Sequence, residues 1–254
     1  QTVEATLPER TYNHITVKDP IVMGWHQVTS QSANSGVSQV VAGTDLNVIS
    51  PTWFSLSDNL GNIKSLASSD YVTYCHQNNI QVWGLVSNLE NKNVDTTTVL
   101  NTTSYRDSLV NNLITQAISY DLDGINVDME ALSVSAKDGY IEFIKELSIK
   151  CEKNDIILSV DNYVPSASTA FYNRSVQADY ADYIAVMAYD EHYVGGDEAG
   201  SVASIGFVEK GVADTLEEVP ADQIILGMPF YARVWAQSDS GLTSMRWQMS
   251  KVTA

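Results

Sequence analysis

Short apolar runs rich in Val and Ile recur along the chain, and several are apolar on both faces. Such runs are typical of parallel strands that are covered on both sides, whereas half-exposed strands alternate apolar and polar residues. Seven strands are predicted in this way, at residues 21–28, 46–54, 81–86, 124–129, 156–160, 183–188 and 224–230.

The segments between these runs carry apolar residues at helical spacing. In residues 104–120, Leu109, Leu113 and Ala117 fall on one stripe of a helix. The same spacing predicts helices at residues 70–79, 135–154 and 201–219, the last of them closed by Pro220. Strands that alternate with helices indicate an α/β fold built on a parallel sheet.

Two architectures fit this alternation: a closed (β/α)8 barrel and an open doubly wound sheet. Glycine-rich phosphate loops of the G-x-G-x-x-G or Walker type follow none of the predicted strands, which disfavours the nucleotide-binding open sheet. Residues 1–20 are expected to be a polar lead-in and residues 21–254 one barrel domain. Residues 236–254 are predicted to be loop or helix, so the last barrel strand is expected to be missing.

Charge and composition narrow the function. The chain has 254 residues, with 14 Lys and Arg against 31 Asp and Glu, and a formal net charge of −17. Such a chain repels phosphates, so no nucleic-acid partner is expected. Apolar runs of about 18 residues, the length that spans a membrane, are absent from the sequence. Its two cysteines, Cys75 and Cys151, make no disulfide framework and are expected to be buried in helices.

The segment DLDGINVDME, residues 121–130, carries the most chemistry. Asn126, Asp128 and Glu130 alternate with apolar residues, so strand geometry places the three polar side chains on one face, about 6–7 Å apart in successive steps. In a barrel this face points inward, and Glu130 lies at the C-terminal mouth where active sites form. Two carboxylates in one cavity repel each other, so one is expected to hold a proton near neutral pH, with Glu130 the better acid.

Two other interpretations of this segment stay open. An amphipathic edge strand would leave its acids in water, although a strand in the middle of a parallel sheet is normally covered on both faces. Carboxylates also bind hard cations, but no histidine neighbours the cluster. We therefore expect no metal and no cofactor.

The segment resembles the signature of glycoside hydrolase family 18, D-G-x-D-x-D-x-E, except that Asn126 replaces the middle Asp. MAYD at residues 187–190 and GMPFYARVW at residues 227–235 resemble two further motifs of the family, in the same order. Residues 84–88, GLVSN, lack the S-x-G-G pattern of many chitinases. The resemblance therefore favours the branch of bacterial spore and cell-wall hydrolases.

Membership of this family implies a (β/α)8 barrel that cleaves β-1,4 bonds next to N-acetylglucosamine with retention of configuration. The acetamido group of the substrate acts as nucleophile, so the protein supplies none. By resemblance, Glu130 protonates the leaving oxygen, Asp128 holds the acetamido N–H, and Tyr189 donates its hydroxyl to the acetamido oxygen.

The remaining site residues have supporting roles. Asp123 is out of phase with the polar face and is expected to form structural hydrogen bonds. Asn126 is uncharged, so it is expected to leave Asp128 more readily ionised than an Asp would. Strand alternation turns Asp190 away from the site unless a bulge re-aims it. The residues expected to bind substrate are Trp53, Met187, Asp190, Tyr231, Arg233 and Trp235.

The leading expectation is a secreted, monomeric glycosidase that acts on peptidoglycan, in the cell wall or spore cortex, after removal of any export signal. A chitin hydrolase is the close alternative. A carbohydrate-binding protein without activity is the alternative of another class, but such family members typically lose the acid that Glu130 provides. A metal-dependent barrel hydrolase would lose activity on chelation.

Overall fold

The computed structural model describes residues 20–239 and 241–248. The chain forms two compact units, Gln1–Leu158 and Ser159–Ala254. The first 19 residues, expected to be a lead-in, lie outside the described residues.

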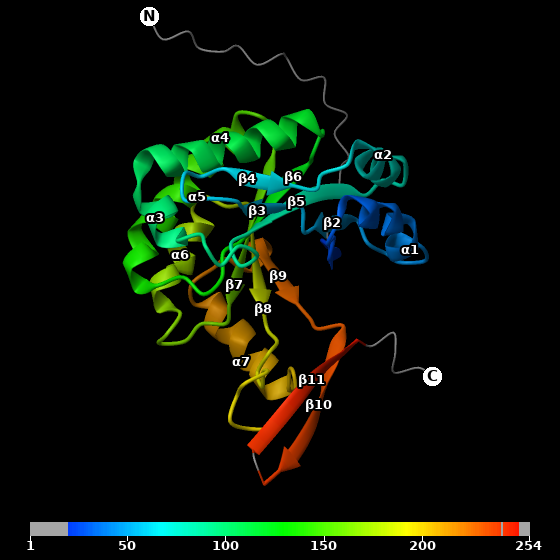
Figure 1. The fold of residues 1–254 in the computed structure, drawn as a ribbon, viewed down its shortest axis with the longest axis vertical. Helices are drawn as coiled ribbons and strands as arrows, with labels where there is room; N and C mark the ends of the chain where they lie inside the picture. The colour runs from blue at the N-terminus through cyan, green and yellow to red at the C-terminus, as the bar shows by residue number, and fades with distance from the viewer. Residues whose placement is uncertain (1–19, 240, 249–254) are drawn as a thin grey trace, which may run out of the picture. The chain divides into compact units, whose positions relative to one another are not determined.

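The first unit is built on a parallel sheet with the strand order β1-β2-β5-β6. Figure 1 labels β2, β5 and β6 of this sheet. Each strand pairs in parallel with the next one in this order. A short antiparallel hairpin, β3 with β4, joins the sheet because β3 also pairs in parallel with β5. The strands are β1 (Met23–His26), β2 (Val48–Pro51), β3 (Phe54–Leu56), β4 (Ile63–Ser65), β5 (Gln81–Ser87) and β6 (Gly124–Asp128).

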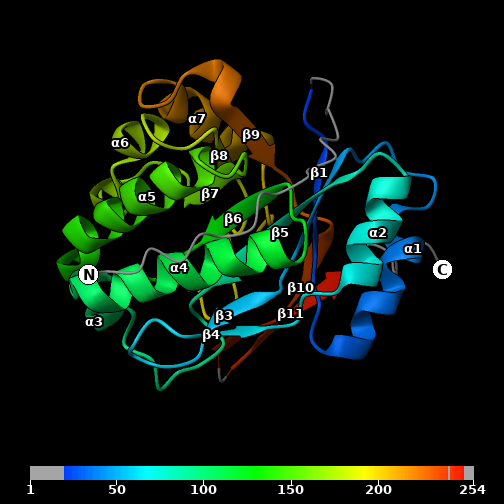
Figure 2. The same cartoon turned by 90° about the horizontal axis from the view of Figure 1, so that it is seen from above.

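The helices of this unit carry the apolar stripes that the sequence predicts. Leu109, Leu113 and Ala117 of α4 are fully buried, and Cys75 of α2 and Cys151 of α5 are buried, as expected, and are not joined in a disulfide. Helices α3, α4 and α5 pack against one another (Figure 2). The helices are α1 (Val37–Val41), α2 (Ser69–Gln77), α3 (Thr96–Asn101), α4 (Thr103–Ser119) and α5 (Lys137–Glu152), with 3-10 turns at Gln31–Gly36 and Val134–Ala136.

Close packing under the sheet explains one glycine. A Cβ atom at Gly84, in the middle of β5, would lie 2.5 Å from the ring of Phe54 and 2.9 Å from Leu122. A larger residue would therefore push β5 away from its neighbours, and β5 leads directly to the polar segment described below.

The second unit contains a parallel sheet of β7 (Ile157–Tyr163), β8 (Tyr183–Met187) and β9 (Ile224–Gly227). Its helices are α6 (Arg174–Ala178) and α7 (Ile205–Leu216), with 3-10 turns at Ala170–Tyr172 and Ala221–Gln223. An antiparallel hairpin follows, formed by β10 (Tyr231–Ser238) and β11 (Gly241–Gln248).

The seven predicted strands are all confirmed, as β1, β2, β5, β6, β7, β8 and β9. The prediction of loop or helix for residues 236–254 was wrong as far as residue 248, because β10 and β11 form a hairpin there. Polar turn residues before Gly241, flanked by alternating side chains, are a hairpin signal. This hairpin is antiparallel and supplies no further parallel strand. Residues 249–254 lie outside the described part.

Candidate active site

The ends of β5 and β6 bring the acidic motif next to a second polar segment. Ser87, the last residue of β5, lies directly opposite Asp128, the last residue of β6. Because parallel strands end at the same edge of a sheet, residues that follow Ser87 lie near those that follow Asp128. In barrels and open α/β sheets alike, active sites form at this edge.

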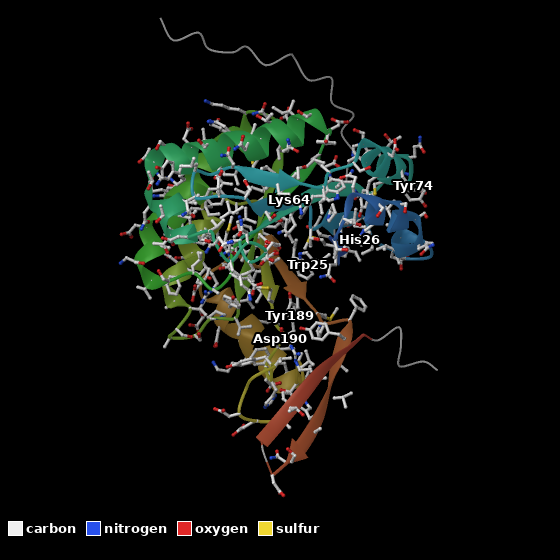
Figure 3. All side chains as sticks on the ribbon, in the orientation of Figure 1. Trp25, His26, Lys64, Tyr74, Tyr189 and Asp190 are labelled. Carbon is white, nitrogen blue, oxygen red and sulfur yellow. The ribbon has the colours of Figure 1, made fainter. Side chains whose placement is uncertain are left out.

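Asn126 on β6 is fully buried and accepts hydrogen bonds from side chains of two other strands, β1 and β2. Its amide oxygen accepts hydrogen bonds from the indole N–H of Trp25 on β1 at 3.0 Å and from the hydroxyl of Ser50 on β2 at 3.1 Å. A neutral amide therefore stands where an acid is usual in the resembling motif. Trp25 is labelled in Figure 3.

The carboxyl group of Asp128 has a strongly raised pKa. Burial raises the pKa of its carboxyl to about 7, and the nearby charges of Glu130 and Glu90 add to the rise. Its Oδ1 atom is buried and has no hydrogen-bond partner within the described part of the chain. A pKa near 7 agrees with the expectation that the two carboxyls of the motif share a proton near neutral pH, and the role of Glu130 as the acid stays a prediction.

Glu130 lies two residues beyond β6, and its backbone is bound by a side chain from the end of β5. The amide of Asn88 donates to the carbonyl of Glu130 and accepts from its N–H, both at 2.9 Å. Beside it, the hydroxyl of Ser87 donates to both carboxylate oxygens of Glu90, at 2.9 and 3.0 Å. Sequence reasoning missed Asn88 and Glu90, although the departure from S-x-G-G at residues 84–88 marked this segment.

Asp123 begins the same motif but has a different role. Its carboxylate is fully buried, accepts from the backbone N–H of Val82 at 2.7 Å and lies 2.8 Å from Nε2 of His76. These contacts tie β6 to β5 and α2 at the N-terminal end of the strands. The expectation of structural hydrogen bonds is confirmed.

The second unit brings together residues of the two other motifs. Asp190 follows β8 with a left-handed φ of 58°, which re-aims its side chain. Its Oδ1 accepts from the hydroxyl of Tyr231 at 2.6 Å and from the guanidinium of Arg233. The ring of Tyr189 meets that of Tyr231 edge to face, with centroids 6.3 Å apart. Figure 3 shows Tyr189 and Asp190 beside the start of the β10–β11 hairpin.

The hairpin also anchors the loop that follows Asp190. Nε of Arg233 donates to the carbonyl of His192 at 3.0 Å, and the indole N–H of Trp235 donates to the carbonyl of Gly200 at 2.9 Å. Alternate residues of β10 thus face the same side, and their polar groups are engaged by the protein. Their expected contacts with substrate stay predictions.

Two residues expected at the substrate are buried instead. Trp53 is 1% exposed, and its indole N–H donates to the side chain of Asn34 at 2.8 Å. Its ring packs edge-on against Tyr71 and Phe54, so no face is open to a sugar ring. Met187, at the end of β8, is also buried. The prediction that Trp53 binds substrate was wrong, because a residue near the end of a strand can still be packed into the core.

The described residues include no group of three or more His, Cys, Asp or Glu side chains arranged to hold a metal ion. In the same residues, no helix is both long and apolar enough to cross a membrane.

Comparison with known proteins decides the family. The sequence model of glycosyl hydrolases family 18 matches residues 43–253. The chain belongs to this family. Family membership accounts for the order of the three motifs and for the α/β fold.

Relatives of the chain include glycosylases of Bacillus subtilis. It is 28% identical over 214 residues to the uncharacterized glycosylase YvbX. The match covers 80% of this chain and 62% of YvbX. It is 25% identical over 186 residues to the cortical fragment-lytic enzyme, covering 69% of this chain and 41% of that enzyme. The chain thus spans less than two thirds of these curated relatives.

Solved structures confirm the fold class, a partial (β/α)8 barrel. The spore cortex-lytic enzyme SleL of Bacillus cereus superposes with a TM-score of 0.78 at 15% identity, over 91% of this chain and 55% of SleL. A chitinase of Chromobacterium violaceum gives a TM-score of 0.74 at 19% identity, over 90% of this chain and 86% of the chitinase.

Proposed function

We propose that the protein is a retaining glycosidase that cleaves β-1,4 bonds next to N-acetylglucosamine in peptidoglycan, by substrate assistance. The observation that carries the proposal is the carboxyl pair of Asp128 and Glu130 at the end of β6. The pKa of Asp128 is raised to about 7 by burial and by the charge of Glu130. Such a pair retains one proton near neutral pH, which general acid catalysis requires.

In the proposed reaction, the proton that the pair retains passes from Asp128 to Glu130, and Glu130 gives it to the bridging oxygen as the bond to C1 breaks. The carbonyl oxygen of the substrate's acetamido group attacks C1 and forms an oxazolinium ion. A water molecule then opens this ring at C1, and Glu130 takes up the proton of that water. Because the nucleophile belongs to the substrate, the protein needs no second carboxylate at the distance of a covalent nucleophile.

Asp128 holds the acetamido N–H and balances the positive charge of the oxazolinium ion. Tyr189 donates its hydroxyl to the acetamido oxygen and so aligns the attack. Tyr231 and Arg233 hold the carboxylate of Asp190, which is 42% exposed, in the orientation proposed to receive a sugar hydroxyl.

The proposed substrate follows from the relatives. The matches to a cortical fragment-lytic enzyme and to spore cortex-lytic enzymes support a peptidoglycan substrate, and with it an extracellular place of action at the cell wall or spore surface. The fold shared with a chitinase supports chitin as the second candidate, because both polymers present the same acetamido group. In either case we propose that the protein acts as a monomer without a metal or cofactor.

The test is digestion of purified peptidoglycan and of chito-oligosaccharides, with products analysed by mass spectrometry. Glu130→Gln is expected to lower the rate by about 10²–10⁴-fold. The matched control is Glu142→Gln, a half-exposed glutamate on α5 that pairs with Lys145 at 3.0 Å. It is expected to leave the rate unchanged.

The outcomes separate the candidates. Release of the β-anomer supports substrate assistance, and an α-product would contradict it. Equal rates for wild type and Glu130→Gln would remove Glu130 from the mechanism. Saccharide binding without products would favour a carbohydrate-binding role, and loss of activity on chelation would favour a metal-dependent hydrolase.

A further inference from the structure

We infer that Asn88 is a positioning residue that fixes the backbone of Glu130 and thereby the place of its carboxyl group. The inference rests on the proposed function, in which Glu130 is the acid. Asn88 itself acts through Glu130 and is assigned no contact with substrate.

One side-chain amide satisfies both backbone groups of one residue. Nδ2 of Asn88 donates to the carbonyl of Glu130, and Oδ1 accepts from the Glu130 N–H, each at 2.9 Å. An amide side chain offers a donor and an acceptor side by side, without the need to take up a proton. A single hydrogen bond leaves a hinge, whereas two on the same residue also set its orientation.

Asn88 is well placed for this task because it directly follows β5. The end of β5 is held in register against β6 up to the pair Ser87 and Asp128. The Nδ2 atom of Asn88 also lies 3.3 Å from the hydroxyl oxygen of Thr96, at the start of α3. The Asn88 side chain that binds the Glu130 backbone is thus itself fixed by the end of β5 and by the start of α3.

The backbone of Glu130 depends on hydrogen bonds from outside its own strand. It lies past the last residue of β6, where the strand ladder no longer supports the backbone. The next residue, Ala131, has a left-handed φ of 50°, which is unfavourable for a residue with a Cβ. Such conformations persist where surrounding contacts over-determine the backbone, and they cluster at functional sites. The pair of hydrogen bonds from Asn88 is such a contact.

The backbone of Glu130 sets the direction in which its side chain leaves the chain. A displacement of about 1 Å of a reacting group costs on the order of 10²-fold in rate. Loss of the hydrogen bonds from Asn88 is therefore expected to lower kcat. KM is expected to stay nearly constant, because Asn88 is not assigned to the substrate.

The experiment compares Asn88→Ala and Asn88→Asp with wild type. The alanine loses both hydrogen bonds. The aspartate keeps the acceptor for the Glu130 N–H and loses the donor to its carbonyl. We expect kcat to fall about 10- to 100-fold for both variants, because in the aspartate an acceptor oxygen would face the Glu130 carbonyl and repel it, with KM within about twofold of wild type. The matched control is Asn91→Ala in the same loop, whose amide donates to the carbonyl of Ser57 at 2.9 Å.

A second readout does not depend on activity: amide hydrogen exchange at the Glu130 N–H, followed by NMR. Asn88→Ala is expected to speed this exchange at least about tenfold, and Asn91→Ala to leave it unchanged. Unchanged exchange in Asn88→Ala overturns the inference. So does a kcat within twofold of wild type in an active enzyme, or an equal loss in Asn91→Ala. If wild type cleaves none of the polymers, the proposed function fails instead, and the exchange measurement still decides whether Asn88 holds Glu130.

Discussion

The indole N–H of Trp25 donates to the amide oxygen of Asn126, at 3.0 Å, and Ser50 adds a second donor at 3.1 Å. Both lone pairs of a neutral oxygen are thus used at a position where related motifs carry an acid. Because the same two donors would stabilise an ionised carboxylate, the position can accept an Asp and hold it charged. The charge of the site can therefore be changed by one substitution.

Asn126→Asp is expected to raise the pKa of Asp128 above about 7, because a negative charge two strand positions away disfavours a second one. At a separation of about 6–7 Å and an effective dielectric constant of about 20, the repulsion is about 2.5 kcal/mol, or close to two pH units. Activity is expected to persist, with the alkaline limb of the kcat/KM profile moved upward. Identical profiles for the two proteins would show that position 126 does not tune the site.

Asp128 also makes folding stability depend on pH. Its pKa rises from 3.8 to about 7 on folding, so the folded state holds the proton more tightly than the unfolded one. Stability is therefore complete below about pH 4, falls as pH rises toward 7, and levels off above it. Relative to Asp128→Asn, wild type is expected to lose about 2–3 kcal/mol between pH 5 and pH 8.

The measurement for Asp128 is urea unfolding of both proteins at pH 5 and pH 8. The comparison with the variant cancels the contribution of the other acidic residues, which both proteins share. A stability difference between the two proteins that stays constant with pH would contradict the raised pKa.

The backbone at Asp190 predicts two separable effects. Asp190→Asn keeps a residue that tolerates the left-handed φ of 58° but removes the charge facing Arg233, and because the carboxylate is 42% exposed the loss is expected to be only about 1 kcal/mol. Asp190→Ala also lacks the short polar side chain that makes the left-handed φ tolerable and removes the acceptor of the Tyr231 hydroxyl, which is expected to cost about 1–2 kcal/mol more. Chemical denaturation of the three proteins measures both steps. Equal stability of the two variants would show that neither the hydrogen bond from Tyr231 nor the left-handed backbone contributes to stability there.

Trp53→Phe distinguishes a core tryptophan from one that stacks on sugar. The change leaves the buried side-chain oxygen of Asn34 without its indole donor, at a cost of about 1–3 kcal/mol in the free energy of unfolding. KM for oligosaccharides is expected to stay unchanged, since the ring is 1% exposed. A higher KM with unchanged stability would instead restore Trp53 to the substrate site.

The regular part of the fold was predictable because its pattern is long and repeated. Residues 135–154 were predicted to be helical, and α5 spans Lys137–Glu152. The short helices α3 and α6 were not predicted, because their six and five residues are too few to show a helical period. The β10–β11 hairpin does not follow from the pattern of the parallel strands, because its two strands pair antiparallel in a sheet of their own.

The site was predictable where it depends on local alternation. Asn126 and Asp128 share a face because strand side chains repeat every two residues. Asn88 lies 42 residues from Glu130, and their contact depends on the register of β5 against β6, which periodicity does not specify. Asp190 was expected to point away, and only its left-handed φ turns it toward Tyr231.

Acidic residues flank strand β6: the fully buried Asp123, bound to Val82 and His76, directly precedes it, and Asp128 is its last residue. Five residue steps of an extended chain separate their Cα atoms by roughly 16 Å. Effects of substitutions that far apart generally add. Asp123 can therefore keep its hydrogen bonds to Val82 and His76 while substitutions change the charge around Asp128. The pH at which such an enzyme works could be re-engineered without loss of those contacts.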